Sequence, residues 1–198
     1  MDDKEKLILP HGGYRNLKSF QISQLIYDIT VRFCDRYIDR FSRTKDQMVQ
    51  AARSGVQNIA EGSVASATSK KTELKLTNVA RASLEELKLD YEDFLRQRNL
   101  PILEPDNPTL TRFKSIRCDS IEGFTQWIEQ EKKVFVCDSP CKSLKSAILV
   151  ANAVLSLLNL EIYLLNKQVN RLANDFETNG GFTERLYKVR KERRNKNK

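Results

Sequence analysis

The sequence predicts an all-α protein: an up-down four-helix bundle with a helical insertion between its third and fourth long helices and a basic C-terminal suffix. Apolar residues recur at steps of three and four through four long segments, the period of helices that bury one face. The 198 residues include only seven Gly and five Pro, too few for the many turns of an all-β fold. A chain of this length can also bury a core without disulfides or metals to support it.

The first three long segments each carry one apolar stripe. The first covers residues 17–41. The second begins at Thr44, which has capping-box spacing with Gln47, and the small residues of its stripe allow a neighbouring helix to approach closely. The third covers residues 69–98 and ends at the three prolines of residues 99–108. The stripes are Ile22, Ile26, Ile29, Phe33 and Tyr37; Met48, Ala52, Gly55 with Val56, Ile59 and Gly62; and Leu76, Ala80, Leu84, Leu87, Tyr91 and Phe94 with Leu95.

The fourth long segment has the most regular pattern in the sequence. Its apolar residues alternate steps of four and three, the 3.5-residue period of left-handed helix packing, and further leucines widen this face. Such a helix should pack against two or three neighbours. Ser139 and Pro140 are the residue types of a helix start, and Gly180-Gly181 should end the helix. The seam is Leu144, Ile148, Ala151, Leu155, Leu158, Ile162, Leu165, Val169, Leu172 and Phe176.

We divide the chain into an N-terminal arm, residues 1–16; the bundle, residues 17–178, with its insertion at residues 100–142; and the suffix, residues 179–198. Within the insertion, residues 109–117 and 120–132 have weak helical patterns. In the suffix, Phe182, Leu186 and Val189 share one face of a short amphipathic segment. No apolar residue follows, so we expect the last nine residues to be unstructured.

The composition favours a soluble cytoplasmic protein without metal or cofactor. The charged N-terminus is not followed by a signal-peptide pattern, and polar residues interrupt the most apolar stretch, residues 147–165, so we expect no membrane span. Cys34 lies in an apolar stripe and should belong to the core. Cys137 and Cys141 lack a second ligand pair and His11 is the single histidine, so free thiols are favoured over a zinc site.

Polar residues accompany the apolar stripes of the second and third helices. Asn58 and Glu61 lie along one edge of the second helix, and Ser83 and Glu86 lie similarly on the third. They form either a hydrogen-bonded site at a ligand or subunit contact, or polar contacts that fix the register of packed helices. No His, Cys or Lys lies in these runs to act as a base or nucleophile, so we expect no enzyme.

Positive charge is concentrated at the C-terminus. The net charge is +8, and residues 184–198 supply +6 of it through eight Lys/Arg and two Glu. Two further lysines lie in the first turn of the third helix, where free backbone N–H groups favour phosphate. These residues suit contact with a phosphate backbone, or on the other interpretation form a solubilising tail and a solvated helix end. The candidate nucleic-acid-binding residues are Lys70, Lys71, Arg185, Lys188, Arg190, Lys191, Arg193 and Arg194.

Two sequence runs resemble a known family. Residues 52–62, which include Asn58-Ile59-Ala60-Glu61-Gly62, and residues 79–87, which include Ser83-Leu84-Glu85-Glu86-Leu87, are similar to the four-helix-bundle proteins encoded in intervening sequences of bacterial 23S ribosomal RNA genes. The same family includes the accessory variability determinant of diversity-generating retroelements. The resemblance covers residues 17–100 and 143–177, and Gly180 to Leu186 look like the suffix of a longer subgroup. The insertion and the suffix depart from the short members.

The resemblance implies a non-enzymatic bundle in which Asn58, Glu61, Gly62, Ser83 and Glu86 belong to the family motif. The retroelement member is a pentameric barrel whose basic surface binds nucleic acid and a reverse transcriptase. We therefore expect a homo-oligomer, with a pentamer as one candidate, that binds RNA or DNA as an accessory protein and takes a protein partner such as a reverse transcriptase. The alternative is a protein–protein scaffold with no role in nucleic-acid binding.

Overall fold

The computed structural model describes residues 13–135 and 144–196, and all regular structure in these ranges is helical. The prediction of an all-α protein is confirmed. The elements are η1 (Tyr14–Asn16), α1 (Lys18–Tyr37), α2 (Arg43–Ala65), α3 (Lys70–Gln97), α4 (Pro108–Ser115), α5 (Ile121–Val134), α6 (Lys145–Asn179) and α7 (Phe182–Lys196).

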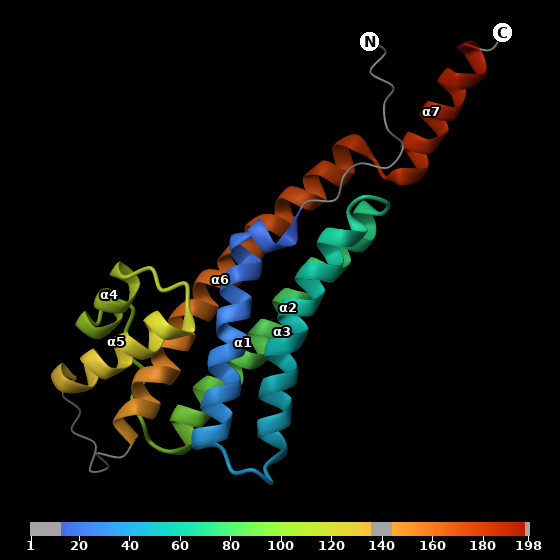
Figure 1. The fold of residues 1–198 in the computed structure, drawn as a ribbon. Coiled ribbons are helices and arrows are strands. Elements are labelled where there is room, and N and C mark those ends of the chain that lie inside the picture. The colour runs from blue at the N-terminus through green and yellow to red at the C-terminus, as the bar shows by residue number, and fades with distance from the viewer. Residues whose placement is uncertain (1–12, 136–143, 197–198) are drawn as a thin grey trace.

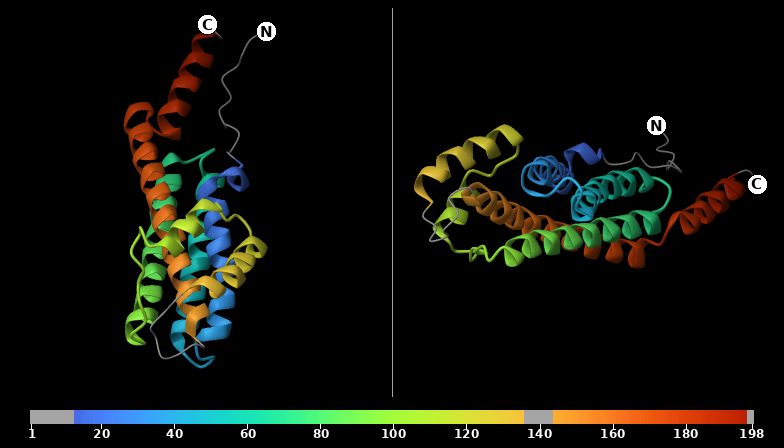
Figure 2. Two further views of the ribbon diagram at one scale, coloured as in Figure 1. Left: turned by 90° about the vertical axis from the view of Figure 1, so that its left-hand side faces the viewer. Right: turned by 90° about the horizontal axis from the view of Figure 1, so that it is seen from below.

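The four long helices α1, α2, α3 and α6 enclose the core (Figure 1). Helix α2 packs against α1 and α3, and α6 packs against the same two helices. The short helices α4 and α5 lie together on one side, where both contact α6 (Figures 1 and 2). Helix α7 follows the end of α6 and projects away from the other helices (Figure 2).

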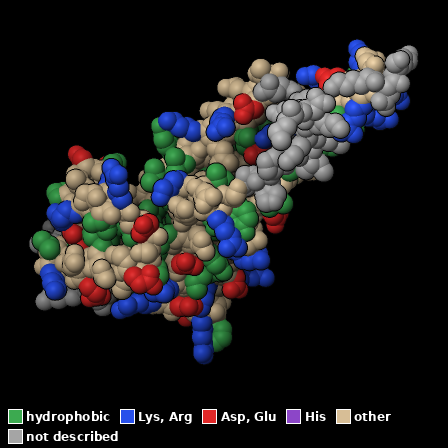
Figure 3. Space-filling view, turned by 45° about the horizontal axis from the view of Figure 1, so that its top comes forward, with side chains coloured by type: hydrophobic (Ala, Val, Ile, Leu, Met, Phe, Trp, Pro, Cys, Tyr) green, Lys and Arg blue, Asp and Glu red, His purple; other side chains and the backbone are tan. Residues whose placement is uncertain are grey.

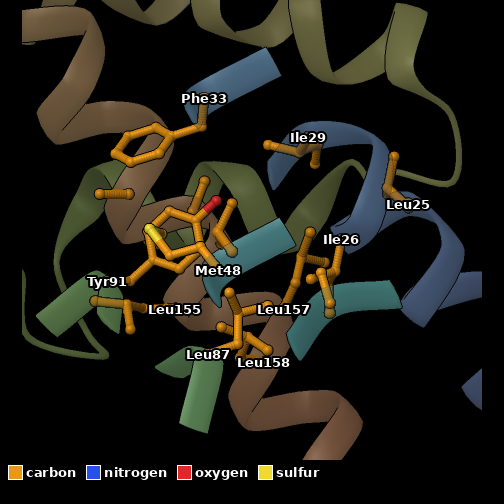
Figure 4. Packing of buried hydrophobic residues seen from close by; sticks show 14 of the residues in the cluster. Leu25, Ile26, Ile29, Phe33, Met48, Leu87, Tyr91, Leu155, Leu157 and Leu158 are labelled. Atoms are coloured by element: carbon orange, nitrogen blue, oxygen red, sulfur yellow. The ribbon is translucent and has the colours of Figure 1, made fainter. Parts of the chain in front are cut away.

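The predicted apolar stripes meet in one core (Figure 4). Ile26, Met48, Leu84 and Leu158, one from each long helix, are all 0% exposed. Aromatic rings pack edge to face or tilted, and the Phe33 ring centroid lies 4.8 Å from those of both Tyr91 and Phe94. The buried Tyr91 hydroxyl donates a hydrogen bond to Thr30 Oγ1 at 3.1 Å, so its polar atom is satisfied.

The described helix boundaries lie close to the predicted ones, except that α1 ends at Tyr37 and not at Phe41 and that α2 begins earlier than predicted. Ser69 caps α3 by accepting a hydrogen bond from the Thr72 N–H at 3.1 Å, close to the predicted start. The capping-box prediction at Thr44 is wrong by two residues, because the Ser42 side chain already accepts a hydrogen bond from the Thr44 N–H and α2 begins at Arg43. The predicted helix start at Ser139 and Pro140 lies outside the described residues.

The end of the chain is more regular than the sequence predicts. The expectation that the last nine residues are unstructured is wrong for residues 190–196, which continue α7. Apolar periodicity is not needed there, because Arg, Lys and Glu are themselves good helix formers. The acidic Glu184 in the first turn of α7 also suits the positive end of the helix dipole.

One described helical stretch, Lys145–Asn195, contains a window that is long and apolar enough to cross a membrane by length and composition. Of that window, 67% is buried inside the protein. The core helix of a soluble protein meets the same criterion, and α6 packs against four other helices in this way.

The small residues of α2 allow α3 to come close, as the sequence predicts. A Cβ atom at Gly55 would lie 2.7 Å from Leu84 Cδ2 and 2.9 Å from Leu84 Cγ, nearer than van der Waals contact allows. Leu84 is fully buried and has little room to move. At Gly62 the same atom would lie 3.4 Å from both the Glu73 carbonyl oxygen and Leu76 Cβ, which is ordinary contact.

Gly55→Ala should therefore destabilise the protein by about 1–3 kcal/mol through overpacking against Leu84, although alanine is the better helix former by ~1 kcal/mol. Gly62→Ala, in the same helix, should be neutral or stabilising. Urea unfolding of both variants measures the difference. Equal stability of the two variants would show that α2 and α3 are not in close contact at Gly55.

Candidate nucleic-acid interface

The predicted basic suffix is held at an angle to α6 by a two-glycine turn. Gly180 has a φ of +65°, a left-handed conformation that glycine adopts without strain. The Gly181 N–H then donates a hydrogen bond to Glu184 Oε2 at 2.8 Å. This carboxylate occupies one of the free amides at the start of α7. The turn and this bond start a new helix that carries the predicted cations.

One face of α7 carries cations and no acidic residue. Arg190, Lys191 and Arg194 lie with Tyr187 around a shallow hollow of about 410 Å³. Arg190 and Lys191 are adjacent in the sequence and Arg194 lies one turn further along, so the three charges span roughly 6 Å of the helix axis at 1.5 Å per residue. Tyr187 is 71% exposed. Figure 3 shows Lys and Arg side chains gathered along this projecting end.

A second hollow brings together cations that are distant in the sequence. Lys70, from the start of α3, and Arg185 and Lys188, from α7, line a space of about 520 Å³ between the α2–α3 turn and the α6–α7 turn. Asp175 and Glu184 line the same space, which leaves a formal excess of one positive charge. Lys70 also pairs with Glu73, with Nζ 2.9 Å from Oε2. This hollow is therefore a weaker site for phosphate than the outer face of α7.

The two remaining candidates are exposed but lie apart from both hollows. Lys71 follows Lys70 in the first turn of α3, and neither Lys71 nor Arg193 lines either hollow. The structure thus groups six of the eight predicted cations into two neighbouring sets at the α7 end of the molecule.

The polar motif residues of α2 and α3 do not form a shared hydrogen-bonded site. The Asn58 amide donates a hydrogen bond to the Ser54 carbonyl oxygen of its own helix at 2.8 Å. Gly62 is buried against α3, Ser83 is half-buried, and Glu61 and Glu86 are exposed. No hydrogen bond between described residues links Asn58 or Glu61 of α2 to Ser83 or Glu86 of α3. Their geometry fits a structural role better than a ligand site.

The sequence interpretation missed a carboxyl group in the core. Glu161 on α6 is 0% exposed, and its Oε1 accepts a hydrogen bond from Ser23 Oγ on α1 at 3.1 Å. Its Oε2 is buried and has no hydrogen-bond partner among the described residues. Burial raises the pKa of Glu161 to about 9, so the group is neutral at physiological pH. The signal was present, because Glu161 follows Leu158 by three residues on the apolar seam.

The structure describes only some of the residues that the sequence offers as thiol or metal-ligand candidates. No group of three His, Cys, Asp or Glu that could hold a metal occurs in the described part of the chain. Cys34 is buried as predicted, and burial raises the pKa of its thiol to about 12, which keeps it unreactive. The other predicted ligand candidates, His11, Cys137 and Cys141, lie outside the described residues.

Comparison with family models, curated proteins and solved structures gives no match to this chain.

Glu161 predicts a pH-dependent stability. Below pH 4.5 the carboxyl is protonated in both the folded and the unfolded chain, whereas between 4.5 and about 9 only the unfolded chain ionises. The free energy of unfolding should fall through this window, by up to about 1.4 kcal/mol per pH unit. Glu161→Gln, which keeps the shape and cannot ionise, should flatten the profile. Urea unfolding of both proteins at pH 5, 7 and 8.5 measures this.

The control for this experiment is Glu85→Gln, which removes an exposed carboxyl from α3. It should keep the pH dependence of the parent protein. Parallel profiles for the parent and Glu161→Gln would contradict a neutral Glu161 in the core.

Proposed function

We propose that this protein is a non-enzymatic accessory protein whose α7 helix binds the phosphate backbone of nucleic acid. The observation that carries the proposal is the outer face of α7, where Arg190, Lys191 and Arg194 line one hollow that no acidic residue lines. Cations on such a face bind by releasing the counterions condensed on the nucleic acid. The long side chains reach phosphates without reading base edges, so binding should depend on salt more than on sequence.

The position of α7 supports this role. The helix projects from the rest of the protein, so a nucleic acid can lie along it without displacing the core (Figure 1). Lys70 and Lys188 extend the cationic surface toward the start of α3. Tyr187 supplies one exposed ring on the same face, enough for a single stacking contact. Binding to either RNA or DNA follows from this chemistry.

The sequence resemblance gives the proposal its wider context. On this proposal the four long helices form an up-down four-helix bundle of the 23S ribosomal RNA intervening-sequence family, with α4 and α5 as its insertion. The protein is then a cytoplasmic homo-oligomer, with a pentamer as one candidate, and a reverse transcriptase is a candidate partner.

The rival function is a protein-binding scaffold, and the insertion provides the observation that favours it. Ile102, Ile116 and Val134 flank or belong to the short helices and are 52%, 47% and 62% exposed. Exposed apolar side chains on one appendage suit a protein contact. The two functions differ in what α7 does, and this makes them separable by experiment.

Reversing the three charges of the α7 face, in Arg190→Glu/Lys191→Glu/Arg194→Glu, should weaken binding of a 30-nucleotide DNA or RNA. Each lost phosphate contact flattens the slope of log affinity against log salt by about 0.7–0.9, so the slope should fall by about 2–3 and the affinity at physiological salt by about tenfold or more. Fluorescence anisotropy at several salt concentrations measures both quantities, and circular dichroism checks the fold.

The matched control is Arg53→Glu/Lys75→Glu/Lys133→Glu, which reverses three exposed charges away from α7. Both triple variants lower the formal charge by six, from +8 to +2. An equal loss in both would show that total charge binds nucleic acid and α7 does not. If the parent protein binds neither DNA nor RNA at 50 mM salt, the nucleic-acid proposal is contradicted and the scaffold function is favoured.

The proposed self-association is tested by mass. Large apolar side chains remain exposed on the long helices and their connections, including Phe41 at 81% and Leu89 at 62%. Light scattering at micromolar concentration should give a mass of two or more times 22.9 kDa. A single species of 22.9 kDa would contradict the oligomer.

A further inference from the structure

A groove separate from the α7 face lies between α1, α4 and α6. Its volume is about 740 Å³, within the range of sites that bind small molecules. Apolar side chains from the three helices line it: Ile22, Leu25, Phe113, Leu157 and Leu160. Leu25, Phe113 and Leu157 are also members of the main core, so this apolar surface is held in place by packing on its other side.

The polar edge of the groove is cationic. Lys18 from α1 and Lys114 and Arg117 from the α4 region line it, opposed by Asp119 alone, which leaves a formal charge of +2. Lys114 Nζ donates a hydrogen bond to the Pro105 carbonyl oxygen at 2.6 Å. Lys18 and Arg117 have no carboxylate partner among the described residues. An apolar surface with unpaired cations at its edge is complementary to a ligand with an apolar body and an anionic head.

The backbone at Arg117 supports a role for this side chain. Arg117 has a φ of +47°, in the left-handed region that side-chain-bearing residues seldom adopt and that Gly fills without strain. A long cation at such a position, at the end of α4, places a guanidinium beside the groove at the cost of backbone strain.

We propose that this groove binds a small amphipathic anion, with its apolar body against Leu157 and Leu160 and its carboxylate, sulfonate or phosphate head between Lys18 and Arg117. The ligand is a free small molecule, because the groove has the volume of a single ligand and three elements bound it. None of the α7 cations lines the groove, so this site does not depend on the proposed function.

The groove has a built-in reporter. Trp127 is the single tryptophan, and its ring centroid lies 4.6 Å from that of Phe113, which lines the groove. The dye 8-anilinonaphthalene-1-sulfonate accepts energy from tryptophan and carries an apolar body with one sulfonate. Its neutral counterpart, N-phenyl-1-naphthylamine, has the same rings without the sulfonate. Quenching of Trp127 therefore reports binding near the groove, and the pair of dyes isolates the contribution of the anionic head.

The full-length protein should bind the sulfonate dye with quenching of Trp127, at least tenfold more tightly than the neutral dye. Lys18→Glu/Arg117→Glu should lower the affinity for the sulfonate dye at least tenfold and change the affinity for the neutral dye less than twofold. Arg53→Glu/Lys75→Glu, with the same change of charge, should leave both affinities unchanged. Equal dye affinities, or equal effects of the two double variants, would overturn the proposal.

A second variant tests the apolar part of the site. Leu160 is 46% exposed, so Leu160→Glu should fold while placing a carboxylate among the apolar side chains. This variant should lower the affinity for the sulfonate dye at least tenfold. Val64→Glu, at a position 50% exposed on α2, should leave that affinity unchanged. Decanoate, a monomeric fatty acid, should displace the dye. Displacement by anionic phospholipid vesicles but not by decanoate would assign this face to a membrane surface and overturn the small-ligand site.

Discussion

The burial of α6 against α1 and α3 is the interaction on which the rest of the structure depends. Helix α6 also contacts α4 and α5, so it positions these two short helices as well as the core. Its residues Ala147, Ile148, Leu149 and Leu158 are all 0% exposed. Each large apolar side chain buried in this way stabilises the fold by roughly 1.5–3 kcal/mol. One neighbouring helix cannot bury so wide an apolar face, so α6 packs against several helices.

Polar residues on the same helix set its position. The Asn166 side chain accepts a hydrogen bond from Arg81 of α3 at 2.7 Å, and Asn152 accepts one from the Leu103 N–H at 2.7 Å. Toward α1, Glu161 accepts from Ser23. These contacts tie α6 to α3, to the segment that follows α3 and to α1 at defined levels. Apolar packing alone tolerates sliding, whereas a buried polar group displaced from its partner remains unsatisfied.

The cationic surfaces of the protein lie outside its apolar core. The cations of α7 lie outside the core, so they can interact with a polyanion without weakening the packing of the long helices. The groove between α1, α4 and α6 uses core side chains on its apolar side and exposed cations at its edge. Glu131 of α5 is 3% exposed and joins this helix to α4, because it accepts hydrogen bonds from Thr109 and Arg112. The Arg112 guanidinium keeps the pKa of Glu131 low.

The sequence alone determined the helices, because their apolar periodicity, caps and breakers act over a few residues. Its stripes identify Ile26, Leu84 and Leu158 as core, and Gly180-Gly181 as the break before the basic suffix. Apolar periodicity did not predict that α7 continues beyond Val189, because no apolar residue follows and the helix there depends on the propensity of Arg, Lys and Glu. Only the tertiary structure placed Lys70 beside Lys188, and Lys18 beside the groove that Arg117 also lines. The sequence places Glu161 along the apolar seam, but only the tertiary structure shows that it is fully buried, because burial depends on which helices cover a position.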